Sequence, residues 1–137
     1  MKEIITGFFE LSGVQYALEA VIKLVFAIVC SGIIGFEREH SHRPAGFRTH
    51  ILVAVGSALV MMPSAYVFKE YEGITNVDPT RLGAQVISGI GFLGAGTILR
   101  EGFSVKGLTT AAGVWTTAGI GLAAGGAAHG DPVVFRT

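Results

Sequence analysis

The sequence has little charge and a single cysteine. Only 15% of its 137 residues are charged, and ten basic residues balance ten acidic ones, whereas soluble domains are about 25% charged. Cys30 alone excludes an internal disulfide and a cysteine-based zinc site. The absence of a basic excess argues against a nucleic-acid partner. Because half of the residues are apolar, intrinsic disorder is also excluded, which leaves a small soluble domain or a membrane protein.

The distribution of the charges favours the membrane protein. Four segments carry few charges or none, namely residues 16–36, 51–68, 82–99 and 108–128. About 20 apolar residues in a helix cross the hydrocarbon layer, and these segments lack the polar face of a soluble helix. The sequence therefore predicts an all-α, polytopic membrane bundle of four transmembrane helices. Glu19 and Lys23 in the first span predict an ion pair, with a role in an ion path as the alternative.

The two ends of the chain differ from this central domain. Four apolar residues of segment 1–13 share one helical face, which predicts a short interfacial helix: Ile4, Ile5, Phe8 and Phe9. The expected organisation is an interfacial segment over 1–13, a transmembrane domain over 14–128 and a short tail over 129–137. Lys and Arg in the loops weakly favour cytoplasmic first and third loops, with both termini outside.

Small residues recur at a four-residue period, which favours close contact between membrane helices. The first span has Ala27, Ser31 and Gly35, and the fourth has an unbroken stripe that includes Gly121 and Gly125. One stripe is expected to remain for a partner, which predicts a homo-oligomer. The glycines expected to pack helices are Gly89, Gly91, Gly94, Gly96, Gly113, Gly121 and Gly125.

Residues 89–94 fit the dinucleotide pattern G-x-G-x-x-G. That pattern requires a preceding strand and an acidic residue about 20 positions later. No Asp or Glu lies between Glu101 and Asp131, and the pattern falls inside an uncharged span. We therefore expect the glycines to pack a helix or to interrupt a span, since unwound backbone in a membrane lines a cavity.

Two prolines and three histidines also predict local features. Asp78 before Pro79 is typical of a helix start, and Pro63 is expected to kink the second span or loosen its last turn. The histidines favour a solvated loop, with metal binding as the alternative because imidazole is a common metal ligand: His40, His42 and His50.

The charges that remain cluster at the ends of the predicted spans. One end is expected to gather Glu37, Arg38, Glu39, Arg48, Arg100, Glu101 and Lys106. Unpaired charges at a membrane boundary are costly, so these groups are expected to pair in a network that locks the helix ends. The alternative is a docking surface or a cation gate, with Glu37 and Glu101 as oxygen ligands of the type that Mg²⁺ prefers. No hydrolase, metalloprotease or P-loop pattern occurs, so an enzyme is not expected.

Several short blocks follow one another along the chain: GFERE at 35–39, AGFRTH at 45–50, DPTR at 78–81, SGIGFLGAG at 88–96, REG at 100–102 and GLTTAA at 107–112. In their order and spacing, these blocks resemble the MgtC/SapB family of bacterial inner-membrane proteins. Carried over by motif, the polar residues of the family are Glu37, Arg38, Arg48, Asp78, Arg81, Arg100 and Glu101.

The resemblance implies a multi-pass protein of the bacterial inner membrane. It also implies a link to Mg²⁺ homeostasis, to growth at low Mg²⁺ and to virulence, with no bound cofactor and with Mg²⁺ as the relevant ion. The expected mode is regulation of a membrane partner such as the F-type ATP synthase, and transport of Mg²⁺ or another cation is the alternative. Such proteins usually have a fifth span and often a soluble domain, which this sequence is expected to lack.

Overall fold

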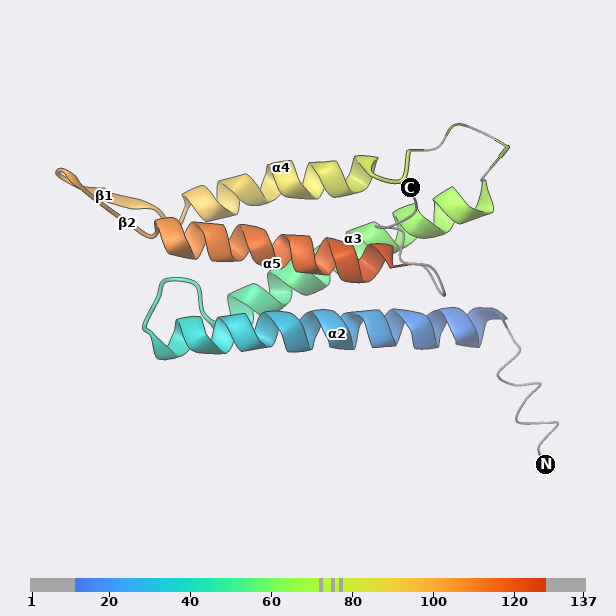
Figure 1. Ribbon diagram of the computed structural model, residues 1–137, viewed down its shortest axis with the longest axis horizontal. Helices are drawn as coiled ribbons and strands as arrows, with labels where there is room; N and C mark the ends of the chain where they lie inside the picture. The colour runs from blue at the N-terminus through green and yellow to red at the C-terminus, as the bar shows by residue number, and fades with distance from the viewer. Residues whose placement is uncertain (1–11, 72, 75, 77, 128–137) are drawn as a thin grey trace, which may run out of the picture.

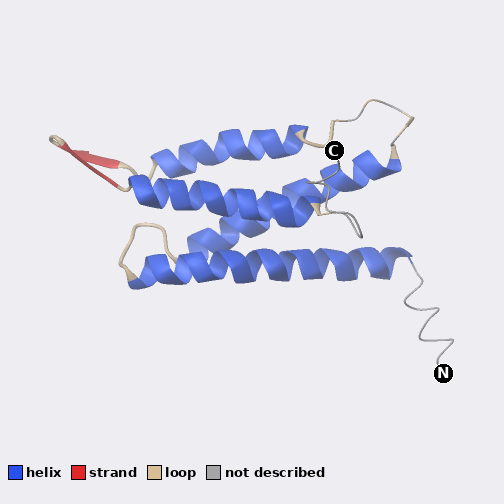
Figure 2. Cartoon of the chain, in the orientation of Figure 1, coloured by secondary structure: helices blue, strands red, loops and turns tan. Residues whose placement is uncertain are grey.

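The computed structural model describes residues 12–71, 73–74, 76 and 78–127. Residues 1–11 of the interfacial segment predicted over 1–13, and the tail predicted over 129–137, lie outside the described residues, whereas Ser12 and Gly13 already belong to the first helix. The elements run in the order α2 (Ser12–His40), α3 (Phe47–Glu70), α4 (Arg81–Ala95), β1 (Leu99–Glu101), β2 (Ser104–Lys106) and α5 (Leu108–Gly126). Successive helices run in alternating directions along a single bundle (Figures 1 and 2).

Among the described residues, two of the four helices are long and apolar enough, by length and composition, to cross a membrane. They cover Gly13–His40 and Phe47–Phe68, and they correspond to the first two predicted spans. The 15 residues of α4 rise about 22 Å, which is less than the ~30 Å hydrocarbon thickness. The structure is therefore a helical bundle with two candidate spans, and crossing by α4 and α5 remains a prediction.

The third predicted span ends earlier than expected, because the chain leaves the helix at a glycine. The helix ends at Ala95, and the Thr97 hydroxyl donates to the Gly94 carbonyl at 2.8 Å. Leu99 then pairs with Lys106 in an antiparallel hairpin, which extends beyond one end of the bundle (Figure 1). Gly102 takes φ +63° in its two-residue turn, a conformation that favours glycine. Segment 99–101 is thus a strand rather than the end of a helix.

The glycine cluster does not interrupt its helix, since residues 89–94 are helical throughout α4. Pro63 lies inside α3, which continues to Glu70, and the kink expected at Pro63 stays a prediction. The predicted ion pair in α2 is confirmed, since Lys23 Nζ lies 2.6 Å from Glu19 Oε1.

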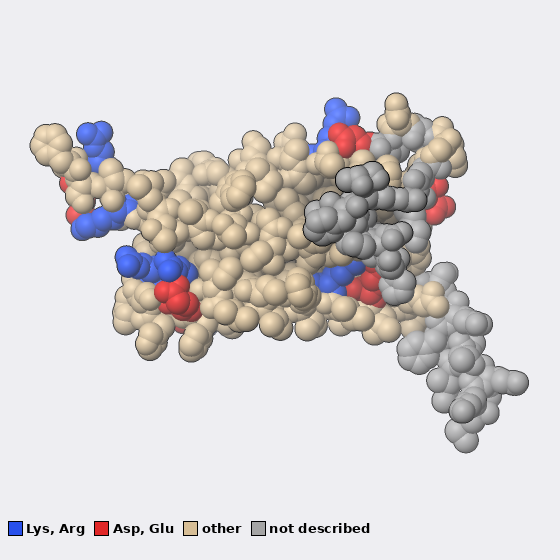
Figure 3. All heavy atoms as spheres, viewed as in Figure 1, with Lys and Arg blue, Asp and Glu red and all other residues tan. Residues whose placement is uncertain are grey.

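Small side chains form the core and large ones face outward. The buried apolar cluster consists of Ala27, Ala54, Ala58 and Ala124. Large apolar residues are exposed along the helices, with Leu52 exposed by 70% and Phe92 by 85%. This arrangement suits a bilayer, where lipid covers large apolar groups and small residues let helices approach. The visible charges gather near the two ends, with an uncharged band between them (Figure 3).

Candidate functional site

One end of the bundle carries the loop between α2 and α3 and the β1–β2 hairpin (Figure 1). Five of the seven predicted polar residues lie on segments at this end. Glu37 and Arg38 are in the last turn of α2, Arg48 is in the first turn of α3, and Arg100 and Glu101 are in β1. The bundle therefore gathers these segments at one end, as the sequence predicts.

The ion pairs at this end are local to each segment. Arg38 Nε pairs with Glu37 Oε2, and Lys106 Nζ lies 2.8 Å from Glu101 Oε2 across the hairpin. Ser41 also donates to Glu37 at 3.0 Å. None of the ion pairs among the described residues links the α2–α3 loop to the hairpin, so the expected network joins neighbours within a segment.

Glu39 stabilises the start of α3. Its Oε2 accepts a hydrogen bond from the Phe47 N–H at 2.8 Å, one of the donors that a helix start leaves without an intrahelical partner. The Gly46 position itself supplies no side-chain cap. A carboxylate near the positive end of the helix dipole is favourable, so Glu39 fixes the entry of the chain into α3.

Asp78 and Arg81 lie at the start of α4, toward the opposite end of the bundle (Figure 1). The helix begins at Arg81 rather than at Pro79, so the predicted helix start is correct to within two residues. Asp78 Oδ1 accepts hydrogen bonds from the Thr80 hydroxyl at 2.7 Å and the Thr80 N–H at 2.9 Å. These bonds, followed by the nearby Arg81 charge, hold the pKa of Asp78 below its usual value.

The three histidines lie in different environments. His40 stacks on Phe36 with ring centroids 6.5 Å apart, and His42 is in the loop with φ +51°. His50 is fully buried. No group of three or more His, Cys, Asp or Glu residues converges within the described part of the chain.

His50 is a buried polar residue that sequence reasoning placed in a loop. Its Nδ1 lies 2.9 Å from the Gly46 carbonyl oxygen, and since a carbonyl only accepts, this nitrogen carries the proton. Its Nε2 is buried without a hydrogen-bond partner. Gly35 of α2 and Gly113 of α5 both approach it, because Cβ atoms there would lie within 3.1 Å and 3.4 Å of His50 atoms. The absent side chain at Gly35 lets the start of α3 approach α2, and the absent side chain at Gly113 leaves room for the imidazole.

The glycine stripe of α5 packs against α3 within the same chain. A Cβ at Gly121 would lie 2.8 Å from Ser57 Cβ and closer still to the Ala54 carbonyl oxygen. A Cβ at Gly125 would lie 2.5 Å from the Ala58 carbonyl oxygen. The small-residue face of α5 is therefore covered by α3 of the same chain, and it is not a surface that remains free for a partner.

The α4 glycines have more space. Gly89 and Gly91 are exposed, and a Cβ at either would meet nothing within 4 Å. Gly94 contacts Ala111 of α5 at ordinary distances, and Gly96 follows the last residue of α4. Of the predicted packing glycines on α4, only Gly94 supports a contact with another helix among the described residues.

Two apolar grooves lie on the surface of the bundle. The α2–α3 groove has a volume of about 440 Å³ and is lined by Ile28, Val29, Gly32, Ile33, Phe36 and Phe47. The α4–α5 groove has a volume of about 290 Å³ and is lined by Ile90, Gly91, Gly94, Ala95, Ile98, Ala111, Ala112 and Trp115. Neither lining contains a charged side chain, so both grooves suit apolar partners.

Apolar helices with small residues at their contacts and charges at their ends define a helical membrane protein. Residues 24–134 match the MgtC family, and the chain belongs to that family. It is 46% identical over 109 residues to the "Putative magnesium transporter YhiD" of Escherichia coli strain K12, covering 78% of this chain and 51% of that protein.

A second relative has the family's own name. The chain is 49% identical over 102 residues to "Protein MgtC" of Brucella abortus strain 2308, covering 74% of this chain and 40% of that protein. The chain thus spans about half the length, or less, of these curated relatives. No solved structure matches it.

Proposed function

We propose that this chain is a non-enzymatic, multi-pass protein of the bacterial inner membrane that supports Mg²⁺ homeostasis by binding a membrane partner. Membership of the MgtC family and the magnesium-related name of the Escherichia coli relative support the link to Mg²⁺. The alternating helix directions support four crossings (Figure 1). A helix as short as α4 is accommodated by local thinning of the bilayer.

The α4–α5 groove is the observation that carries this proposal. Its lining includes five Gly and Ala residues, which leave the helix backbones close to the surface: Gly91, Gly94, Ala95, Ala111 and Ala112. Trp115 forms part of the lining and is half exposed. Membrane helices associate where small residues permit close van der Waals contact, so this groove suits a helix of another subunit.

The partner we propose is a helix of a larger membrane complex, with the F-type ATP synthase as the first candidate and a second copy of this chain as another. Either contact would use the α4–α5 groove, since the α5 stripe is already packed on α3. Regulation through this contact would support growth at low Mg²⁺ and, in a pathogen, virulence.

The test combines growth at low Mg²⁺ with capture of partners from native membranes. Gly91→Leu and Ala112→Leu fill the groove, and each is expected to abolish both complementation of a deletion strain and recovery of the partner. Gly56→Leu is the matched control, because Gly56 is exposed on α3 with nothing within 4 Å of an added Cβ. Normal growth and capture with both groove variants would contradict the proposal.

Cation transport is the second candidate, favoured by the name of the Escherichia coli relative, "Putative magnesium transporter YhiD". Glu37 and Glu101 would be the oxygen ligands, and each already pairs with a cation of its own segment. Purified protein in vesicles with a Mg²⁺-sensitive dye separates the two candidates. Flux that is abolished by Glu101→Gln would favour transport, and no flux above empty vesicles would favour the regulator.

A further inference from the structure

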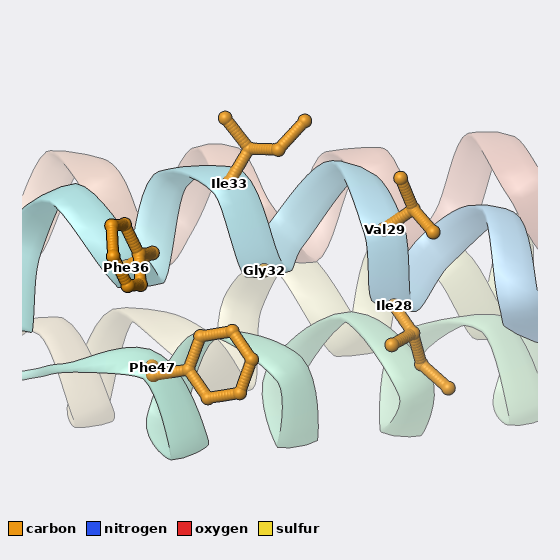
Figure 4. Close-up of a pocket in the computed structure, with 6 residues that line it drawn as sticks. All are labelled: Ile28, Val29, Gly32, Ile33, Phe36 and Phe47. Carbon is orange, nitrogen blue, oxygen red and sulfur yellow. The ribbon is translucent and has the colours of Figure 1, made fainter.

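The α2–α3 groove is open along the side of the bundle. Phe36 and Phe47 lie at one end of it, and Ile28 and Val29 lie at the other (Figure 4). All six lining residues are apolar or glycine. In a bilayer, such a groove is filled by hydrocarbon rather than by water.

The shape of this groove depends on the glycine in its floor. A Cβ at Gly32 would lie 3.3 Å from Phe47 Cε2 and 3.8 Å from Ile51 Cδ1, so its absence lets the Phe47 ring approach α2. Ile33 and Phe36, exposed by 69% and 67%, form the outer side of the groove. The volume of about 440 Å³ is within the range of small-molecule sites, roughly 300–1,000 Å³.

The end of the groove near Phe47 is also the end at which the chain carries an excess of positive charge. Segment 37–48 contains three arginines and two glutamates. Both carboxylates have partners, since Glu37 binds Arg38 and Glu39 accepts the Phe47 N–H. Arg48 follows Phe47 in the first turn of α3 and is exposed, and no ion pair among the described residues includes it.

We infer that the α2–α3 groove binds an anionic glycerophospholipid, with an acyl chain in the groove and the headgroup phosphate at Arg48. This inference rests on the membrane placement in the proposed function. The planar guanidinium matches phosphate with two parallel hydrogen bonds. A zwitterionic lipid offers the same phosphate together with its own cation, so the positive segment favours a lipid with net negative charge.

The test measures lipid binding to the full chain in two steps. Flotation with phosphatidylcholine vesicles first establishes membrane insertion, which both the proposed function and this inference require. Native mass spectrometry then compares binding of phosphatidylglycerol and phosphatidylcholine to the purified protein. We expect phosphatidylglycerol to bind about fivefold more tightly, the effect of roughly one cation near a headgroup.

Three variants locate the site. Arg48→Gln should remove the preference for phosphatidylglycerol and leave phosphatidylcholine binding unchanged, whereas Ile33→Trp should weaken binding of both lipids by filling the groove. Arg81→Gln is the matched control, because Arg81 is an exposed arginine at the start of α4 and outside the groove lining. It should leave both lipids unaffected.

Several outcomes would overturn the inference. They are equal binding of the two lipids, an equal loss of preference in Arg48→Gln and Arg81→Gln, and full competition by glycerol 3-phosphate, which has no acyl chain. If the chain floats with vesicles but shows any of these results, the lipid site is wrong and the proposed function stands. A failure to float overturns both.

Discussion

Glycines on α5 and on α4 look alike in the sequence but have different surroundings in the fold. At Gly121 and Gly125, the backbone of α3 occupies the place where a side chain would begin. At Gly89 and Gly91, a Cβ would meet nothing within 4 Å. The α5 glycines therefore permit close contact between α5 and α3, whereas the absent side chain at Gly91 leaves part of a surface groove open. The difference predicts opposite responses to the same substitution.

Gly121→Ala should give the largest effect. The added methyl group would collide with the Ala54 carbonyl oxygen and with Ser57 Cβ, so α5 must move away from α3. Overpacking of this kind costs about 3 kcal/mol. Unfolding in detergent micelles by SDS titration measures the change, and a variant as stable as the native chain would show that α5 does not contact α3 in this way.

Gly89→Ala and Gly91→Ala should each increase stability by up to ~1 kcal/mol, because alanine is the better helix former and the methyl groups meet no neighbour. The same SDS titration provides the comparison. A destabilisation as large as that of Gly121→Ala would mean that α4 is packed against something other than the described part of this chain.

Gly113→Ala should change the stability by an amount between the loss at Gly121 and the gain at Gly89 or Gly91. Its Cβ would lie 3.4 Å from His50 Nε2, which is contact with a side chain rather than with backbone. The gain in helix propensity and the closer contact should nearly cancel, leaving a change within ~0.5 kcal/mol. A loss comparable to that of Gly121→Ala would indicate that His50 cannot adjust.

Asp78 should give the smallest effect, confined to the first turn of α4. Its pKa is lowered in the fold, so the ionised carboxylate stabilises the first turn of α4 at pH values above the ordinary aspartate pKa of about 3.9. That contribution is lost as the pH falls through the lowered value. Titration of the Asp78 carboxyl carbon by NMR should give a midpoint below the ordinary pKa of aspartate, while Asp78→Ala should speed hydrogen exchange at the Thr80 amide. A midpoint at or above that ordinary pKa would contradict the two hydrogen bonds.

The sequence predicts the positions of the four helices well, because runs of apolar residues between charges depend only on local composition. It does not predict the β1–β2 hairpin, since two three-residue strands are too short for an alternating pattern to appear. Gly102 next to a charged pair is the one local signal for that turn. The MgtC family assignment is confirmed by the match over residues 24–134.

The sequence is a poorer guide to which neighbouring helix each glycine contacts. Small residues at a four-residue period indicate that one face of a helix lacks large side chains. Which helix packs against that face depends on how the helices are arranged. The sequence predicts that one of the small-residue stripes remains for a second subunit, and the stripe with Gly121 packs on α3 of its own chain. His50 similarly belongs to a polar loop in the sequence, and only the crossing of α2, α3 and α5 buries it.

The central claim is that the α5 stripe binds α3 of the same chain, and disulfide cross-linking tests it most directly. A Cβ at Gly126 would lie 3.4 Å from Met61 Cγ, so side chains at positions 61 and 126 would be in direct contact and cysteines there can be tested as a cross-link. In a Cys30→Ala background, Met61→Cys with Gly126→Cys should oxidise to a monomer with an internal cross-link. Mixing two differently tagged copies should yield no crossed product. Covalent dimers that carry both tags would show that the stripe joins two chains and would contradict this account.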